Sequence, residues 1–209
     1  DFFGFGKIPK AVKSIMRRMF LRRLIVSVLT TLFVLSAVSC GHTDPKAAAG
    51  EISRYLAESE KIVVTSSVSA DYGDRVFDFK LTCTKSPEKT ELEIKAPENL
   101  AGMKAVCTDG GYALSFDGVQ VTTGALTRNG LSPAEALPAL LQQWQTGYVS
   151  GAVLETYNGT DAVALDTNIT DTVTQRTWFD TSTLLPLHSE ISQDGKAVIF
   201  CDFENIIIE

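Results

Sequence analysis

Residues 76–83, VFDFKLTC, decide the fold of this chain, because hydrophobic and polar side chains alternate strictly along them. The hydrophobic set is Phe77, Phe79, Leu81 and Cys83. A half-buried antiparallel strand has this period of two, with one side on the core and the other in water. We therefore expect residues 76–83 to form such a strand.

The runs that follow this stretch show the same alternation. Leu92 and Ile94 lie between charged residues, and two further runs are separated by Asp117-Gly118, a dipeptide typical of tight hairpins. The hydrophobic residues of those two runs are Leu114, Phe116, Val119 and Val121. The connections between residues 61 and 124 are too short for crossover helices, so we expect an antiparallel meander rather than a βαβ fold.

Strand patterns resume after Gly151 and continue to the end of the chain. The runs are VLETYNG, AVALDTNI, VTQRTWFD, LPLHSEIS and AVIFCDFENIIIE, separated by turn residues such as Asn158-Gly159 and Asp194-Gly195. With the first half, this gives about eleven strands.

Two helices are expected beside these strands. Asp44-Pro45 predicts the start of a short amphipathic helix, and residues 132–135, SPAE, form a capping box for a second one. The second helix carries a hydrophobic stripe that we expect to pack beneath the sheet: Leu137, Leu140, Leu141 and Trp144. Pro138 lies within it, so we expect a kink or a late start there.

These patterns predict an α+β fold: a curved antiparallel sheet of about eleven strands, an incomplete β-barrel, wrapped around one or two helices. Few helices fill poorly the space under so many strands, so the concave side is expected to keep an apolar cavity. The residues expected to line it are Phe77, Phe79, Leu81, Leu92, Ile94, Leu114, Phe116, Leu141, Trp144 and Trp178. The alternative for each of them is an ordinary place in the hydrophobic core.

Residues 16–40, MRRMFLRRLIVSVLTTLFVLSAVSC, have the three parts of a secretory signal peptide: a basic start, a short apolar core and small residues at its end. Residues 37–41, AVSCG, resemble a lipobox, after which Cys40 would carry lipid. Ala37 and Ser39 also fit ordinary signal peptidase, and an uncleaved anchor helix is the third possibility. We expect an extracytoplasmic protein anchored to the cell membrane as a bacterial lipoprotein.

The expected organisation is a signal segment with upstream residues (1–39), a tether (40–44) and one domain (45–209). Beyond residue 39 the chain has 12 basic and 24 acidic residues, which gives a net charge of −12. A strongly acidic domain does not attract phosphates, so nucleic acid is not an expected partner.

If Cys40 is lipidated, three cysteines remain: Cys83, Cys107 and Cys201. Each lies in a strand-like run, where a free cysteine behaves as a small buried hydrophobic residue. A disulfide between Cys83 and Cys107 is the alternative in an oxidising compartment.

The motifs of catalysis are absent from the sequence. It contains no GxSxG, HExxH or Walker-type glycine loop, and its two histidines are His42, beside the tether, and His188, in a strand. His188 shares its side of the strand with Glu190, which favours a solvated polar surface. We expect neither an enzyme nor a metal or cofactor site.

Two stretches carry a resemblance to a known family. Residues 77–118 run from FDFKLTC to the aromatic strand and turn YALSFDG, and residues 176–206 include WFD, LP and the hairpin residues DGK. This pattern resembles the LolA-like superfamily, exported carriers of lipoproteins and lipids that include LolA, LolB and LppX. The matching positions are Trp178, Asp180, Pro186, Asp194 and Gly195.

The resemblance implies a half-barrel with an apolar cavity for acyl chains, without naming the ligand. The expected function is therefore a membrane-anchored lipoprotein that binds a lipid or another apolar ligand in the concavity of the sheet. The alternative is an interaction or sensor module of the same fold, without a small-molecule ligand, whose acidic outer side meets another protein of the cell envelope.

Overall fold

The structure is a computed structural model that describes residues 44–108, 111–123 and 129–209. The expected signal segment and Cys40 lie outside these residues. Residues 44–209 form one compact unit. Among the described residues, no helix is both long and apolar enough to span a membrane.

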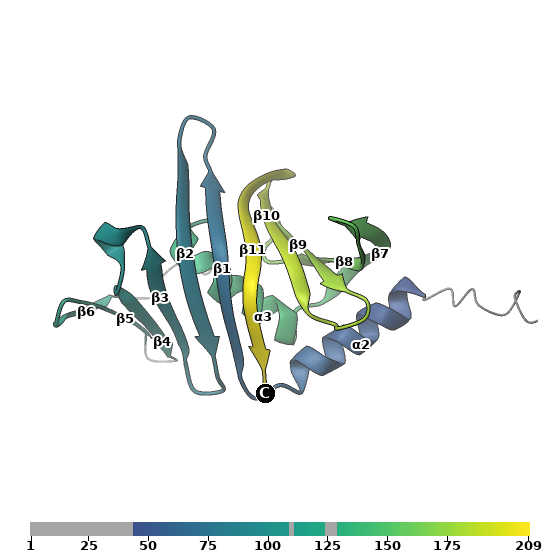
Figure 1. Ribbon diagram of the computed structural model, residues 1–209, viewed down its shortest axis with the longest axis horizontal. Coiled ribbons are helices and arrows are strands. Elements are labelled where there is room, and N and C mark those ends of the chain that lie inside the picture. The colour runs from purple at the N-terminus through teal and green to yellow at the C-terminus, as the bar shows by residue number, and fades with distance from the viewer. Residues whose placement is uncertain (1–43, 109–110, 124–128) are drawn as a thin grey trace, which may run out of the picture. The chain divides into compact units, whose positions relative to one another are not determined.

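The fold is an antiparallel sheet of eleven strands with two helices packed on one side, which confirms the predicted α+β class (Figure 1). The helices are α2 (Pro45–Ala57) and α3 (Pro133–Thr146), with a short 3-10 turn, η2 (Glu98–Leu100). The first six strands are β1 (Ile62–Asp71), β2 (Val76–Lys85), β3 (Thr90–Ala96), β4 (Lys104–Thr108), β5 (Gly111–Phe116) and β6 (Val119–Thr123). The last five are β7 (Val149–Tyr157), β8 (Thr160–Asn168), β9 (Val173–Asp180), β10 (Pro186–Gln193) and β11 (Lys196–Ile208).

The sheet is built from two meanders that meet in its middle. Its strand order is β6-β5-β4-β3-β2-β1-β11-β10-β9-β8-β7, so the first and last strands lie side by side (Figure 1). Their pairing runs from Ile62 opposite Ile208 to Ala70 opposite Ile199. Strands β6 and β7, which are joined through α3, form the two edges.

Tight turns set the register of the hairpins. At Asn158-Gly159 both residues have positive φ, 48° and 83°, as a two-residue type I′ turn requires. Asp117-Gly118 and Asp194-Gly195 also have positive φ at both positions. The turn dipeptides seen in the sequence therefore mark true hairpins.

The helix termini differ in part from expectation. Asp44 caps α2 through its carboxylate, which accepts a hydrogen bond of 3.1 Å from the amide of Lys46. In α3 the Ser132 side chain makes no capping hydrogen bond, so the half of the predicted capping box that Ser132 would supply is not formed. A late start at Pro138 is also wrong: the helix begins at Pro133 and continues through Pro138.

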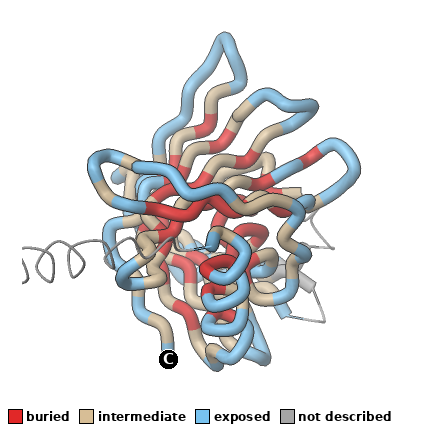
Figure 2. The backbone as a smooth tube through the Cα atoms, turned by 90° about the vertical axis from the view of Figure 1, so that its right-hand side faces the viewer, coloured by how far each residue is buried: buried red, intermediate tan, exposed pale blue. Residues whose placement is uncertain are grey.

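The stripe of α3 packs beneath the sheet as predicted. Leu137, Leu140 and Leu141 are fully buried and Trp144 nearly so. We call the side of the sheet that faces α2 and α3 the helix side, and the opposite side the outer side. Figure 2 shows the buried stretches gathered where strands and helices face each other, with exposed hairpin tips beyond them.

Two of the cysteines belong to this core. Cys83 and Cys201 are free thiols with no exposed surface, and burial raises the pKa of both well above its ordinary value. The interpretation as buried hydrophobic residues is confirmed for them, and the alternative disulfide between Cys83 and Cys107 is not formed.

Candidate functional site

The two helices leave one end of the helix side exposed, the end formed by β5 and β6. Helix α3 packs against β1, β2 and β3, and α2 packs against α3, β7 and β8. Strands β5 and β6 lie at the end of the sheet away from both helices (Figure 1), whereas Cys107 of β4 lies close enough to α3 to line a cavity with it. Several helix-side residues of these two strands are exposed.

The register identifies the side chains of this open surface. Leu92 pairs with Ala105, Ala105 with Leu114, and Leu114 with Val121. Since paired residues of an antiparallel sheet point to the same side, Ala105, Leu114 and Val121 lie on the helix side with the buried Leu92. Phe116 and Val119 form the next pair of the same row. An apolar row thus runs from the core to the edge of the sheet.

Exposure increases steadily along this row. Leu92 is buried, Leu114 is half-buried, and the exposed fractions of Phe116, Val121 and Val119 reach 40%, 53% and 64%. We call the set Leu114, Phe116, Val119 and Val121 the open apolar row. Hydrophobic side chains left in water as a contiguous group are a common feature of binding surfaces.

The ten residues expected to line a cavity differ in burial and in the side of the sheet on which they lie. Leu81, Leu92, Leu141 and Trp144 are buried in the core. Phe79, Ile94 and Leu114 are half-buried, whereas Phe77 and Phe116 are exposed. Trp178 pairs with Ala164 and His188 on the outer side. The structure therefore brings nine of the ten to the helix side and separates Trp178 from them.

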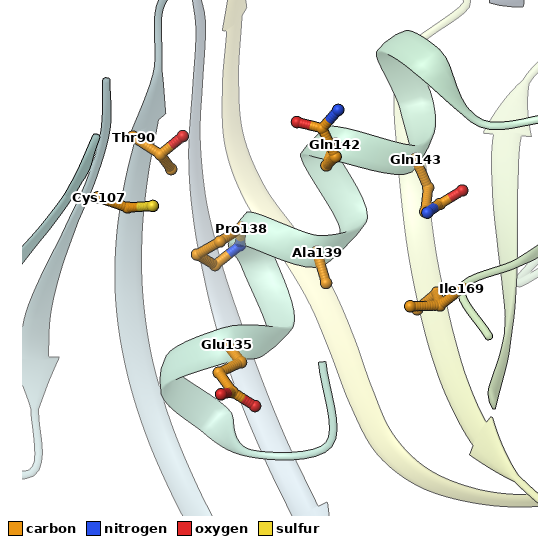
Figure 3. A pocket seen from close by; sticks show the side chains of 8 residues that line it. All are labelled: Thr90, Cys107, Glu135, Pro138, Ala139, Gln142, Gln143 and Ile169. Atoms are coloured by element: carbon orange, nitrogen blue, oxygen red, sulfur yellow. The ribbon is translucent and has the colours of Figure 1, made fainter. Parts of the chain in front are cut away.

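A small cavity lies between α3 and the strands β3 and β4. It has a volume of about 60 Å³ and is lined by Thr90 and Cys107 on the strands, by residues of α3 and by Ile169 (Figure 3). Figure 3 shows Pro138 and Gln142 turned toward the two strand residues. Pockets for drug-sized ligands measure roughly 300 to 1,000 Å³. An acyl chain therefore does not fit inside this cavity as it stands.

The outer side of the second half-sheet carries an aromatic cluster that the sequence analysis missed. The ring of His188 stacks on Tyr157 with centroids 5.1 Å apart, and Trp178 lies 5.4 Å from the same imidazole. His188 keeps only 6% of its surface exposed. The expected solvated strand surface is therefore wrong for this residue, because two aromatic neighbours cover it. The sequence did contain a signal for this cluster. Neighbouring residues of a strand point to opposite sides of the sheet, so Trp178 and Phe179 could not both face the core.

Charged groups surround this aromatic cluster. Nδ1 of His188 lies 2.7 Å from a carboxylate oxygen of Asp202. Arg176 forms a two-pronged pair with Asp166, at 2.8 and 3.1 Å, and its guanidinium lies 5.7 Å from the Trp178 ring centroid. The hydrogen bond with Asp166 is the main reason why the pKa of Arg176 is raised.

The carboxylates give this part of the outer side a negative character. Burial raises the pKa of Tyr157, and the nearby charges of Asp202 and Glu190 raise it further. Glu155 accepts a hydrogen bond from the indole of Trp178. Among the described residues, no three His, Cys, Asp or Glu side chains are grouped so that they could hold a metal ion.

No model of a protein family matches the chain, and no curated protein sequence matches it at a significant level. Solved structures do match. One is a DUF1329 family protein from Desulfovibrio piger ATCC 29098, with 14% identity, a TM-score of 0.46, and coverage of 80% of this chain and 94% of that one.

Two further matching structures have titles that name LolA or LppX. A LolA superfamily protein from Nitrosomonas europaea has 10% identity, a TM-score of 0.40, and coverage of 79% and 93%. The lipoprotein LppX from Mycobacterium tuberculosis has 10% identity, a TM-score of 0.42, and coverage of 77% and 95%. At such identities these likenesses concern the fold alone.

Proposed function

We propose that the protein is a membrane-anchored, extracytoplasmic binding protein that takes up the acyl chain of a lipid, or a similar apolar ligand, on the helix side of its sheet. The observation that carries this proposal is the open apolar row beyond α3, with its two most exposed valines at the sheet edge. No catalytic step is part of the proposal.

The energetics suit a moderate affinity. Each methylene moved from water onto an apolar surface contributes about 0.8 kcal/mol, so ten would contribute about 8 kcal/mol before other costs. Association and ordering of the chain reduce this sum. We expect dissociation constants near the micromolar range, about 1 μM to 100 μM.

A fluorescent fatty-acid displacement assay on residues 41–209 tests the binding proposal. Val121→Asp places a charge in the open apolar row and should abolish binding. Gln120→Asp is the matched control, because Gln120 is the exposed neighbour on the other side of the same strand. Equal binding by both variants, or no saturable uptake by the unchanged protein, would refute the proposal.

We further propose that Cys40 carries the lipid anchor. The support is the junction Ser39-Cys40-Gly41 at the end of a signal-like segment, four residues before the cap of α2. In a bacterial host that processes lipoproteins, Cys40→Ser should move the protein from the membrane to the soluble fraction. Unchanged membrane retention would mean that the apolar segment itself is the anchor.

The second candidate function is an interaction module that meets a basic surface of another envelope protein. The carboxylates around Trp178 and Tyr157 on the outer side favour it, since charge complementarity guides such encounters. A photo-crosslinking residue at Val153, exposed on the outer side of β7, would test this candidate against one at Val121. Protein adducts at Val153 alone support the second candidate, and lipid adducts at Val121 support the first.

A further inference from the structure

A second and smaller cavity lies where both helices meet the second half of the sheet. Its volume is about 20 Å³, and its walls come from α2, α3 and strands β7–β9. The side chains that matter for its chemistry are Trp144, Thr167, Gln175 and Thr177. It lies beneath both helices, at the opposite end of the sheet from the open apolar row.

Two polar atoms in this cavity wall lack partners within the described part of the chain. They are Oγ1 of Thr167 and Oε1 of Gln175. The two residues keep only 5% and 2% of their surface exposed. They are directly paired across β8 and β9, so their side chains lie next to each other on the helix side. Buried polar groups without a hydrogen bond are rare in native proteins.

The neighbouring hydrogen bonds explain why Gln175 cannot satisfy its oxygen locally. Its Nε2 donates to Oγ1 of Thr177 at 3.1 Å, and Nε1 of Trp144 donates to the same oxygen at 3.1 Å. A hydroxyl oxygen has two acceptor sites, so both are used. The Thr177 proton then goes to Oγ of Ser189, 2.7 Å away. In this network no donor is within hydrogen-bond distance of Gln175 Oε1.

We propose that this cavity is a binding site for a single water molecule. The water would accept the hydroxyl proton of Thr167 and donate one of its own to Oε1 of Gln175. A site for one water needs about 10 to 15 Å³ of such space and at least two polar partners, and both conditions are met here. The cavity is too small for an apolar ligand.

The water gives the polar residues of this core a structural role. It completes a chain of hydrogen bonds from Thr167 through Gln175 and Thr177 to Ser189, and Trp144 of α3 joins that chain. The site therefore helps to hold α3 in one position against β8 and β9. This role is independent of any ligand on the open apolar row.

A high-resolution crystal structure of the purified protein tests the proposal directly. We expect a water oxygen within about 3.2 Å of both Thr167 Oγ1 and Gln175 Oε1. An empty cavity would overturn the proposal. So would a turned Gln175 amide that donates directly to Thr167.

A stability measurement provides an independent test. Thr167→Val keeps the side-chain shape but removes one partner of the water, so the denaturant midpoint should fall relative to the unchanged protein. If the cavity is dry, the same change removes an unsatisfied hydroxyl and the midpoint should rise. Thr174→Val, at an exposed position on the outer side of β9, gives the effect of the Thr-to-Val change without the cavity.

Discussion

The indole nitrogen of Trp144 lies 3.1 Å from Oγ1 of Thr177 and donates to it the hydrogen bond that ties α3 to β9. The same indole makes T-shaped contacts with two phenylalanine rings, Phe179 at 5.7 Å and Phe203 at 5.3 Å between centroids. One side chain thus joins a helix to both β9 and β11. Its contribution to stability should be correspondingly large.

Trp144→Ala should lower the free energy of unfolding by about 3 to 5 kcal/mol, because it removes a large buried side chain and leaves a cavity. Trp144→Phe keeps much of the packing and loses the hydrogen bond, so we expect a smaller loss of about 1 to 3 kcal/mol. Urea unfolding followed by circular dichroism measures both. A near-neutral effect of Trp144→Ala would show that α3 is not a part of the core.

Glycine replacements should have opposite signs at two positions. Gly50→Ala should stabilise the protein by about 1 kcal/mol, because Gly50 lies inside α2 and an added Cβ meets nothing within 4 Å. Gly159→Ala should destabilise it by about 1 kcal/mol, because its φ of +83° is a backbone conformation that alanine disfavours. Thermal unfolding of the two variants checks this pair, and a shift of the same sign in both would contradict it.

The Asp180 carboxylate gives a pH-dependent prediction. Hydrogen bonds from the hydroxyl and amide of Ser182 and from the amide of Thr183 lower the pKa of Asp180 below its ordinary 3.8. A lowered pKa stabilises the fold fully above the unfolded value, and this stabilisation is lost as the pH falls through the folded value. Ser182→Ala should raise the pKa of Asp180, as measured by NMR titration of its carboxyl carbon. An unchanged titration curve would show that Ser182 is not the main cause of the lowered pKa of Asp180.

The buried thiols should be protected from chemical modification. In residues 41–209 with Cys107→Ser, Cys83 and Cys201 are the remaining cysteines, and neither has exposed surface. Since the thiolate is the reactive form and burial raises the pKa of both, a thiol reagent at neutral pH should react only after unfolding. Reaction of the native protein as fast as that of the unfolded one would contradict this prediction.

The strands could be predicted from the sequence because their local signals agree. Alternation as in residues 76–83 and turn dipeptides such as Asn158-Gly159 depend on neighbouring residues only, and the structure has strands and hairpins at these places. The order of the strands could not be predicted in this way. The pairing of β1 with β11 joins residues far apart in the sequence, and no local pattern specifies it.

The candidate site was harder to predict because hydrophobicity alone does not say which side of a strand faces the helices. Trp178 and Phe179 are adjacent and both aromatic, yet Phe179 is buried on the helix side and Trp178 lies on the outer side. The prediction of Trp178 as a cavity residue followed from its size and apolar character. In the same way, the polar pattern around His188 suggested a solvated surface, because the cover over it comes from Tyr157 on a different hairpin.

The central pairing of β1 with β11 has a consequence for the order in which parts of the chain can fold. The ion pair of Lys61 with Glu209 links residues 148 positions apart, and within the sheet the two halves meet through the pairing of β1 with β11. Such long-range closure is slow compared with the formation of local hairpins. Until β11 is in place, β1 and β10 each have an unpaired edge.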